Sequence, residues 1–187
     1  DESPDLTSLR LPQRFVEEAV SARRGLIFVC GETGSGKTTS LAAVLKARAE
    51  MGEHIITIED PIEYIQKGKF PMQFLQREVG EGKDVASFDV ALASAVRQAP
   101  KIILIGELRD ANSALTAIHA ANTGHLIFFT THTGSISEAV QSILELIPAD
   151  QRDHVKALVP SLMRAGLCQR LVKGKNGKRF AIHELLM

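Results

Sequence analysis

The eight residues GETGSGKT, Gly31 to Thr38, constrain the fold of this chain more than any other feature. They fit the pattern G-x-x-x-x-G-K-[ST]. The apolar run Leu26–Cys30 before them predicts a buried strand, and the helical pattern Thr39–Met51 follows, ending at Gly52. A phosphate-binding loop lies between a strand and a helix, so the sequence favours such a loop over an ordinary glycine-rich turn.

The residue types of this motif suit a nucleoside triphosphate and Mg²⁺. Its glycines let the backbone wrap around phosphates, so that amide hydrogens and the helix N-terminus face the oxygens. Lys37 supplies a positive charge for the terminal phosphates, and the Thr38 hydroxyl is a candidate ligand of Mg²⁺. The predicted nucleotide-binding residues are Glu32, Thr33, Gly34, Ser35, Gly36, Lys37, Thr38 and Thr39.

Apolar runs that alternate with helical segments predict a parallel sheet. Helices are expected at 87–98 and 111–122, with Ser87 and Asn112 as their N-caps. Three further buried strands are expected, at Ile55–Ile58, Ile102–Ile105 and Leu126–Thr130. This alternation is typical of an α/β fold with helices on both faces of the sheet and ligands beyond the carboxyl ends of the strands.

The last third of the chain has a helical pattern. Ser135 and Glu138 form a predicted capping box at the start of one helix. A second helix is predicted at 148–166, with Asp150 as its N-cap and a kink or break at Pro160. Two strand-like pieces, LCQRLV and FAIHELL, flank the polar turn KGKNGKR. The predicted parts are a helical lead-in at 1–24, a P-loop core at 25–133 and a small helical C-terminal part with short strands at 134–187.

A carboxylate follows the apolar run Ile102–Ile105, where a P-loop protein usually presents an aspartate. This chain presents Gly106 and then Glu107. Two interpretations stay open from position alone. Glu107 could orient an attacking water and hold the hydration shell of Mg²⁺ opposite Thr38. It could instead be a surface glutamate paired with Arg109 or another basic residue.

A second acidic group follows the strand predicted at Ile55–Ile58. Glu59, Asp60 and Glu63 would lie together at the sheet edge, where their mutual repulsion favours a nearby cation. A solvated acidic turn is the alternative interpretation. His132 is expected at the same edge, where an imidazole can contact the terminal phosphate. His125 should open its strand at the opposite edge, and His119 and His54 are expected to be structural.

Missing motifs and composition exclude several classes of protein. The chain lacks N-K-x-D and L-S-G-G-Q, which disfavours a small GTPase and an ABC transporter subunit. Its 22 basic and 22 acidic residues create no global field toward nucleic acid or an anionic membrane. At least one strand, Ile55–Ile58, separates the P-loop strand from Ile102–Ile105, which favours a RecA-like core.

The length and cysteine content suit one cytoplasmic domain. With 187 residues, 44% of them apolar, the chain can form a real core. Its longest apolar runs are far shorter than the roughly 20 residues that cross a bilayer, and no signal peptide is visible. Cys30 and Cys168 lie far apart and match no metal or disulfide spacing. The chain begins at Asp1 rather than methionine, so we expect a piece of a longer protein.

Four ordered motifs resemble those of the secretion-superfamily ATPases, the hexameric motors of type IV pili and of type II and type IV secretion. Beside the P-loop, IEDPIEY resembles the family's Asp box, IILIGELRD its Walker B segment and TGHLIFFTTHT its His box. LQREVG, at 75–80, also resembles a family segment. The similarity runs from about Arg23 to about Leu171, and it is greatest to the pilus-retraction and type IV secretion members.

The resemblance implies a role for each of several residues. Glu107, Glu63 and His132 would be catalytic, and Thr38 and Glu107 would serve the metal, with ATP and Mg²⁺ as cofactors. The residues with supporting roles would be Glu59, Asp60, Arg77, Arg97 and Arg109. The Gly-Glu ending of the Walker B segment is the family's own form. Two cysteines cannot supply the four-cysteine zinc module that many extension-type members carry, so no zinc is expected.

Departures from the family pattern concern the residues before Ile102, one proline and the N-terminus. Ala99, Pro100 and Lys101 stand where the family often has Asp-Pro-Asp, and Pro160 interrupts a helix that is usually whole. The family's N-terminal domain, which packs on a neighbouring subunit, is not in this sequence. We therefore expect this chain to bind nucleotide and to hydrolyse it weakly.

The function implied is a cytoplasmic motor ATPase that works as a homohexamer on the cytoplasmic face of the inner membrane. It would power secretion, conjugative transfer or pilus retraction or assembly through a membrane platform. A RecA-like nucleic-acid translocase or helicase is the alternative, suggested by the basic residues Arg164, Arg170, Lys173, Lys175, Lys178 and Arg179. One tyrosine and no tryptophan leave few platforms for base stacking, so nucleic acid is not the expected ligand. A subunit that binds ATP without hydrolysing it is a third possibility.

Overall fold

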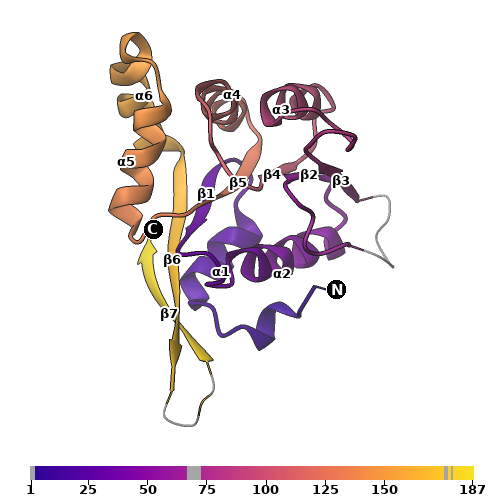
Figure 1. Ribbon diagram of the computed structural model, residues 1–187, viewed down its shortest axis with the longest axis vertical. Coiled ribbons are helices and arrows are strands. Elements are labelled where there is room, and N and C mark those ends of the chain that lie inside the picture. Colours follow the sequence, from indigo (N-terminus) through magenta and orange to yellow (C-terminus); the bar gives the residue numbers. More distant parts are fainter. Residues whose placement is uncertain (1–2, 67–72, 175–176, 178) are drawn as a thin grey trace.

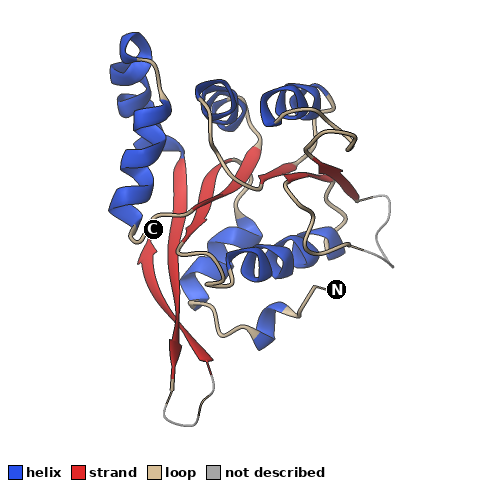
Figure 2. Ribbon diagram, in the orientation of Figure 1, coloured by secondary structure: helices blue, strands red, loops and turns tan. Residues whose placement is uncertain are grey.

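A seven-stranded sheet forms the centre of the molecule (Figures 1 and 2). The computed structural model describes residues 3–66, 73–174, 177 and 179–187. The strands lie in the order β3-β2-β4-β5-β1-β6-β7, and every neighbouring pair is parallel except β6 and β7. Their bounds are β1 Gly25–Cys30, β2 Ile55–Glu59, β3 Phe74–Glu78, β4 Ile102–Ile105, β5 Leu126–Thr131, β6 Met163–Lys173 and β7 Arg179–Leu186. The predicted α/β fold with a mostly parallel sheet is confirmed.

Helices cover both faces of this sheet (Figure 1). The short 3-10 helix η1 and helices α1 and α2 lie on one side, and α3 to α6 lie on the other. Their bounds are η1 Leu6–Ser8, α1 Gln13–Ser21, α2 Lys37–Glu50, α3 Phe88–Arg97, α4 Ala111–Asn122, α5 Ile136–Leu146 and α6 Ala149–Leu162. Within the described residues, none of these helices combines the length and hydrophobicity needed to cross a lipid bilayer.

The β1 strand is apolar throughout because it is buried on both faces. Successive side chains of a strand point to opposite faces, so its residues divide between two cores. Ile27 and Val29 pack with α1 and α2. Phe28 and Cys30 pack with the helices of the other side, where Phe28 stacks on Phe129 of β5 with 5.6 Å between ring centroids. This double burial anchors the strand that leads into the P-loop.

The spatial order of the strands corrects one expectation from the chain order. The strand Ile55–Ile58 was expected to separate the P-loop strand from Ile102–Ile105, but β2 pairs with the far side of β4. The strand between β1 and β4 is β5. One strand does separate the P-loop strand from β4, as predicted, but that strand is β5 and not β2. The order of strands along the chain does not fix their order across a sheet.

The observed N-cap residues match the predicted ones for α3 and α5 and differ for α4. Ser135 accepts a hydrogen bond from the Glu138 amide at 3.2 Å, which confirms this half of the capping box. Ser87 holds the N-cap position of α3, although its hydroxyl bonds the Asp89 carboxylate instead of a helix amide. The prediction of Asn112 as N-cap is wrong: Asp110 caps α4 and accepts from the Ser113 amide at 2.8 Å.

The second C-terminal helix is shorter than predicted. It ends at Leu162 instead of Gly166, Pro148 rather than Asp150 holds its N-cap position, and Pro160 lies in its last turn. The next residues extend β6, which pairs in parallel with β1 from Leu26 to Cys30. The two strand-like pieces are therefore parts of the main sheet, β6 and β7, joined as an antiparallel pair. Pairing with an open strand edge outweighed the local helical pattern at 163–166.

Gly166 gives a stability prediction because it faces an aromatic ring. A Cβ at this position would lie 2.5 Å from Phe28 Cζ and 2.7 Å from Cε1. We expect Gly166→Ala to lower the free energy of unfolding by about 1–3 kcal/mol, measured by urea denaturation, because the packed core cannot absorb the added methyl. Combining it with Phe28→Leu should cost less than the sum of the two single changes. Unchanged stability in Gly166→Ala would contradict this packing.

Candidate active site

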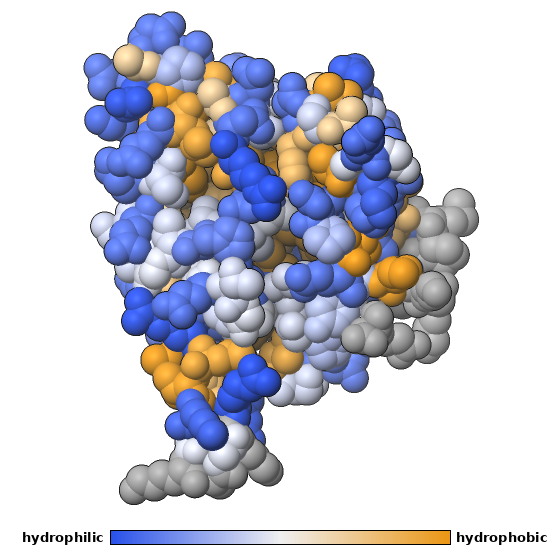
Figure 3. Space-filling view, in the orientation of Figure 1, coloured by the Kyte–Doolittle hydropathy of each residue, from blue (hydrophilic) through white to orange (hydrophobic). Residues whose placement is uncertain are grey.

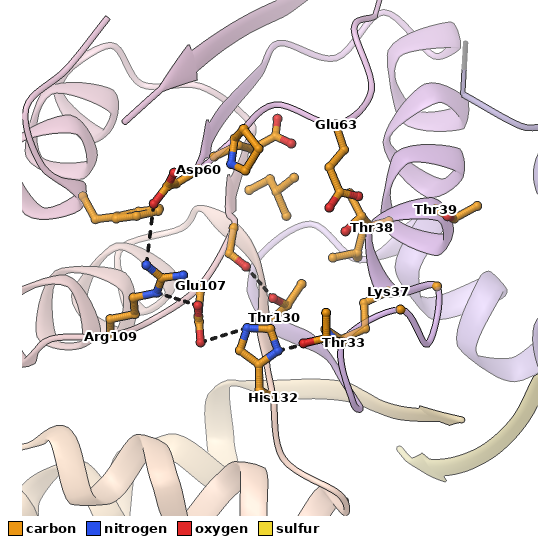
Figure 4. Close-up of a pocket in the computed structure, with 18 residues that line it drawn as sticks. Thr33, Lys37, Thr38, Thr39, Asp60, Glu63, Glu107, Arg109, Thr130 and His132 are labelled. Carbon is orange, nitrogen blue, oxygen red and sulfur yellow. Dashed lines mark hydrogen bonds and ion pairs between the residues drawn. The ribbon is translucent and has the colours of Figure 1, made fainter. Parts of the chain in front are cut away.

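A cavity of about 290 Å³ opens at the carboxyl ends of the central strands (Figure 4). Five segments that are distant in sequence line it: the P-loop with the start of α2, the turn after β2, the start of α3, the end of β4 with the turn after it, and the end of β5 with His132. Predicted site residues among its lining are Thr33, Gly34, Gly36, Lys37, Thr38, Thr39, Glu59, Asp60, Glu63, Glu107, Arg109 and His132. The parallel sheet therefore gathers the separate motifs at one edge.

The P-loop has the backbone that its glycines permit. Gly34 and Gly36 have φ values of +77° and +93°, in the left-handed region that glycine adopts without strain. Lys37 begins α2, and its Nζ donates to the carbonyl oxygens of Gly31 at 2.8 Å and Glu32 at 3.0 Å. An ammonium has three donors, and the third faces His132 Nδ1 at 3.5 Å, a long contact that a phosphate oxygen can replace.

Lys37 is 7% exposed and has acidic and imidazole neighbours. Burial lowers the pKa of its ammonium from the ordinary value, and the negative charge of Glu107 opposes that shift. Its Nζ also lies 3.5 Å from His132 Nδ1. The lysine is thus held at the centre of the site, between the loop it belongs to and the strand-end residues opposite.

Glu107 links the turn after β4 to His132 directly and to the turn after β2 through Arg109. Its Oε1 lies 3.2 Å from His132 Nε2, and its Oε2 accepts from Arg109 Nε at 2.5 Å. Arg109 Nη1 lies 3.6 Å from an Asp60 carboxylate oxygen. Figure 4 shows these side chains as one line across the cavity, which continues to Lys37 through His132. Glu107 therefore pairs with Arg109, as one interpretation expected, but it does so inside the cavity; its role toward water and Mg²⁺ stays a prediction.

The surroundings of Gly106 explain why β4 is followed by Gly-Glu. Its amide donates to the Ile58 carbonyl at 2.7 Å, and a Cβ there would lie 3.2 Å from that same oxygen. Its own carbonyl accepts a hydrogen bond from the Thr130 hydroxyl. Since neighbouring backbone leaves little room for a side chain, glycine lets the chain cross close to β2 and present Glu107 to the cavity.

The acidic residues after β2 differ in their surroundings. Glu59 is 7% exposed and accepts from Thr57 Oγ1 at 2.6 Å and from Gln76 Nε2 at 3.4 Å. Burial raises the pKa of Glu59, and those two hydrogen bonds oppose the shift. Asp60 is exposed and paired with Arg109. Glu63 lines the cavity and points toward Thr38 (Figure 4).

The donor set at this end of the cavity fits Mg²⁺. The Thr38 hydroxyl and the carboxylates of Glu63 and Glu107 line one cavity, and all are oxygen donors of the kind that Mg²⁺ prefers. Few direct protein ligands are needed, because Mg²⁺ in nucleotide sites keeps several waters and binds phosphate oxygens. The chemistry of these residues is therefore compatible with a magnesium nucleotide.

Some predicted residues lie away from the cavity. Glu32 is exposed and Ser35 is buried, and neither lines it. Thr39, by contrast, lines the cavity, and its hydroxyl lies 3.0 Å from the Tyr64 hydroxyl. Arg77 in β3 and Arg97 at the end of α3 are not among its lining residues.

The basic residues near the C-terminus do not all fall within the described chain. Lys175 and Lys178 lie outside it. Arg164 donates to the Arg24 carbonyl at 3.2 Å, and Arg170 to the Gly134 carbonyl at 2.8 Å. These two arginines therefore have structural partners on the protein itself.

Sequence reasoning missed residues that support the site from outside the motifs. Gln169 of β6 bonds the P-loop, and Gln76 ties the turn after β2 to β3 through the Tyr64 carbonyl at 2.9 Å. No motif identified Gln169, whereas Gln76 lies within LQREVG. Cys30 and Cys168, distant in sequence, are partners in register across β1 and β6. Burial, with the neighbouring Cys168 thiol, raises the pKa of Cys30 to about 12, as for an inert core thiol.

Comparison with known proteins gives a consistent result. Over 165 residues, the chain is 41% identical to the type IV pilus retraction ATPase PilT of Pseudomonas aeruginosa, covering 88% of this chain and 47% of that protein. It is 40% identical over 184 residues to a twitching motility protein of Neisseria gonorrhoeae, covering 97% and 48%. The chain thus spans about half the length of the curated relatives it matches.

Solved structures of such proteins have a fold similar to that of this chain. The crystal structure of the pilus retraction motor PilT with bound ADP matches with a TM-score of 0.91 and 40% identity, covering 100% of this chain and 53% of that one. The Legionella pneumophila ATPase DotB matches with a TM-score of 0.87 and 26% identity, covering 100% and 51%. The model of the type II/IV secretion system protein family matches residues 5–183. The resemblance noted from four motifs is confirmed, and the chain belongs to the type II/IV secretion system protein family.

Proposed function

We propose that this chain is the nucleotide-binding and nucleotide-hydrolysing part of a motor ATPase for pilus retraction, pilus assembly or secretion. The observation that carries the proposal is the line of contacts from Lys37 through His132 to Glu107 in one cavity. It joins a residue for the phosphates to a carboxylate for the attacking water. Relatives named as pilus and secretion ATPases, one with bound ADP, support the same function.

ATP binding is assigned to the P-loop. Its amides and the start of α2 would surround the phosphates, and Lys37 would give its third donor to a terminal phosphate oxygen. Thr38 would ligate Mg²⁺ directly, and Glu107 would hold its water shell. Bound Mg²⁺ would neutralise phosphate charge and so favour the hydrolytic transition state.

Hydrolysis is assigned to the carboxylates and the imidazole opposite the P-loop. Glu107 would orient the attacking water and accept its proton, and Glu63, across the cavity near Thr38, would hold the same water. For this, Glu107 must exchange at least one of its contacts with Arg109 and His132 for the water. His132 would then turn to the terminal phosphate and report its presence or loss, with Glu59 and Asp60 in support.

The assembly proposed is a homohexameric ring on the cytoplasmic face of the inner membrane, acting on a membrane platform of the pilus or secretion system. Family membership supports this assembly. Arg77 and Arg97 lie outside the cavity of this single chain, so we assign them to contacts between subunits or to a neighbour's nucleotide. Arg109 is assigned to the same site, through Glu107 and Asp60.

The test is to measure phosphate release and native mass of the full-length protein with and without ATP. We expect Mg²⁺-dependent turnover and a particle of six subunits. DNA or RNA should leave the rate unchanged, and stimulation that falls steeply with salt would favour a nucleic-acid translocase instead. ATP binding without turnover in the assembled ring would point to a nucleotide-gated assembly subunit.

A further inference from the structure

Strand β6 continues past the end of β1 and lies beneath the P-loop. The two strands are paired in parallel as far as Cys30 and Cys168. At Gly31 the chain leaves the sheet to form the loop, whereas β6 continues with Gln169. Gln169 is only 4% exposed. A buried amide must be hydrogen-bonded to avoid a desolvation cost, so its partners show what it holds.

Gln169 bridges the loop and the helix that follows it. Its Nε2 donates to the Ser35 carbonyl at 2.7 Å, and its Oε1 accepts from the Ser40 hydroxyl at 2.9 Å. A flipped amide would place its oxygen against the Ser35 carbonyl oxygen, so only this orientation satisfies both partners. One side chain therefore fixes the P-loop relative to the first turn of α2.

The backbone and side chain of β6 also set which residues the loop can contain. A Cβ at Gly31 would lie 2.2 Å from the Gln169 carbonyl oxygen, and one at Gly36 would lie 2.7 Å from Gln169 Nε2. Backbone of β6 thus excludes a side chain at Gly31, whereas a side chain at Gly36 would displace the Gln169 amide; both positions also have backbone angles that favour glycine. The P-loop therefore packs directly against Gln169.

This contact has a consequence for phosphate binding. In a trans peptide the carbonyl and the following amide hydrogen point in opposite directions. With the Ser35 carbonyl directed to Gln169, the Gly36 amide hydrogen points away from β6. Gly36 lines the cavity, whereas Gln169 does not. Gln169 would therefore orient the Gly36 amide toward a phosphate without contacting the nucleotide itself.

We propose that Gln169 is a positioning residue that holds the P-loop in its phosphate-binding conformation from beneath. The inference rests on the proposed nucleotide-binding function of the same loop. It connects the β6–β7 pair to the nucleotide site, because the residue that fixes the loop belongs to the strand that β7 pairs with.

The test uses Gln169→Met, which keeps the length and volume of the side chain but removes both hydrogen bonds. Ser40→Ala removes one bond and leaves Gln169 in place. With a fluorescent ADP analogue, we expect the dissociation constant to rise about tenfold in Gln169→Met and about threefold in Ser40→Ala. Gln98→Met, at an exposed glutamine after α3, is the matched control and should bind as wild type.

A merely structural role would lower the melting temperature of the ligand-free protein and leave the dissociation constant unchanged. Folded Gln169→Met that binds within twofold of wild type would overturn the inference. If Gln169→Met does not fold, unchanged affinity in Ser40→Ala overturns it. Wild-type protein that binds no ADP would overturn the proposed function together with this inference, whereas binding by wild type but equally by Gln169→Met removes only the positioning role.

Discussion

Glu107→Gln should reduce ATP turnover by a factor of about 10²–10⁴ and leave nucleotide binding nearly unchanged. Glutamine has the same size as glutamate, but it cannot accept the proton of the attacking water. It also loses the charge that pairs with Arg109 and His132. The P-loop lies on the other side of the cavity and keeps its own contacts with Lys37. Phosphate release and binding of a fluorescent ADP analogue, both in the full-length protein, measure the two effects.

Glu50→Gln is the matched control for this change. Glu50 is an exposed glutamate at the end of α2, away from the cavity, so the variant should turn over ATP like the wild type. Turnover in Glu107→Gln equal to that of Glu50→Gln would remove Glu107 from the reaction. It would leave the surface ion pair with Arg109 as the only role of this residue.

Lys37→Met is expected to weaken nucleotide binding by about 100-fold. Methionine keeps most of the buried stem of the side chain, whereas the charge that would attract the phosphates is lost. The change also leaves the carbonyls of Gly31 and Glu32 without their donor, which loosens the loop itself. Equilibrium titration with the fluorescent ADP analogue measures the loss.

Lys156→Met controls for the removal of a lysine. Lys156 is exposed on α6, on the other side of the sheet from α2, and its replacement should not change affinity. If Lys37→Met binds ADP as tightly as this control, the P-loop is not the phosphate site. The Lys37 and Glu107 variants together separate binding from turnover, since the first should lose both and the second only turnover.

Apolar surface remains on the long β6–β7 pair at the edge of the sheet. Figure 3 shows apolar side chains gathered over the lower part of the molecule, where these two strands extend from the body. The exposed apolar residues of the pair are Leu171, Val172, Phe180, Ile182 and Leu186. Exposed apolar side chains that gather in this way are common at contact surfaces.

Local patterns in the sequence determined the parts of the fold that depend on near neighbours. The P-loop, the strands β1, β2, β4 and β5 and the helices between them followed from apolar periodicity and glycines. The gathering of Lys37, Glu107 and His132 also followed, because parallel strands place their carboxyl ends at one edge. Each of these inferences needs only the chain direction and a short segment.

Only the tertiary structure decided the features that depend on which strands become neighbours. The residues 163–166 have a helical pattern but form strand, since the open edge of β1 offers hydrogen bonds that a local pattern cannot reveal. The same pairing brings Cys30 beside Cys168 and places Gln169 under the P-loop, across 134 residues of sequence from Ser35. The sequence alone therefore determined which residues meet at the site. The strand order decided what supports that site, because contacts between distant residues depend on sheet pairing rather than on local propensity.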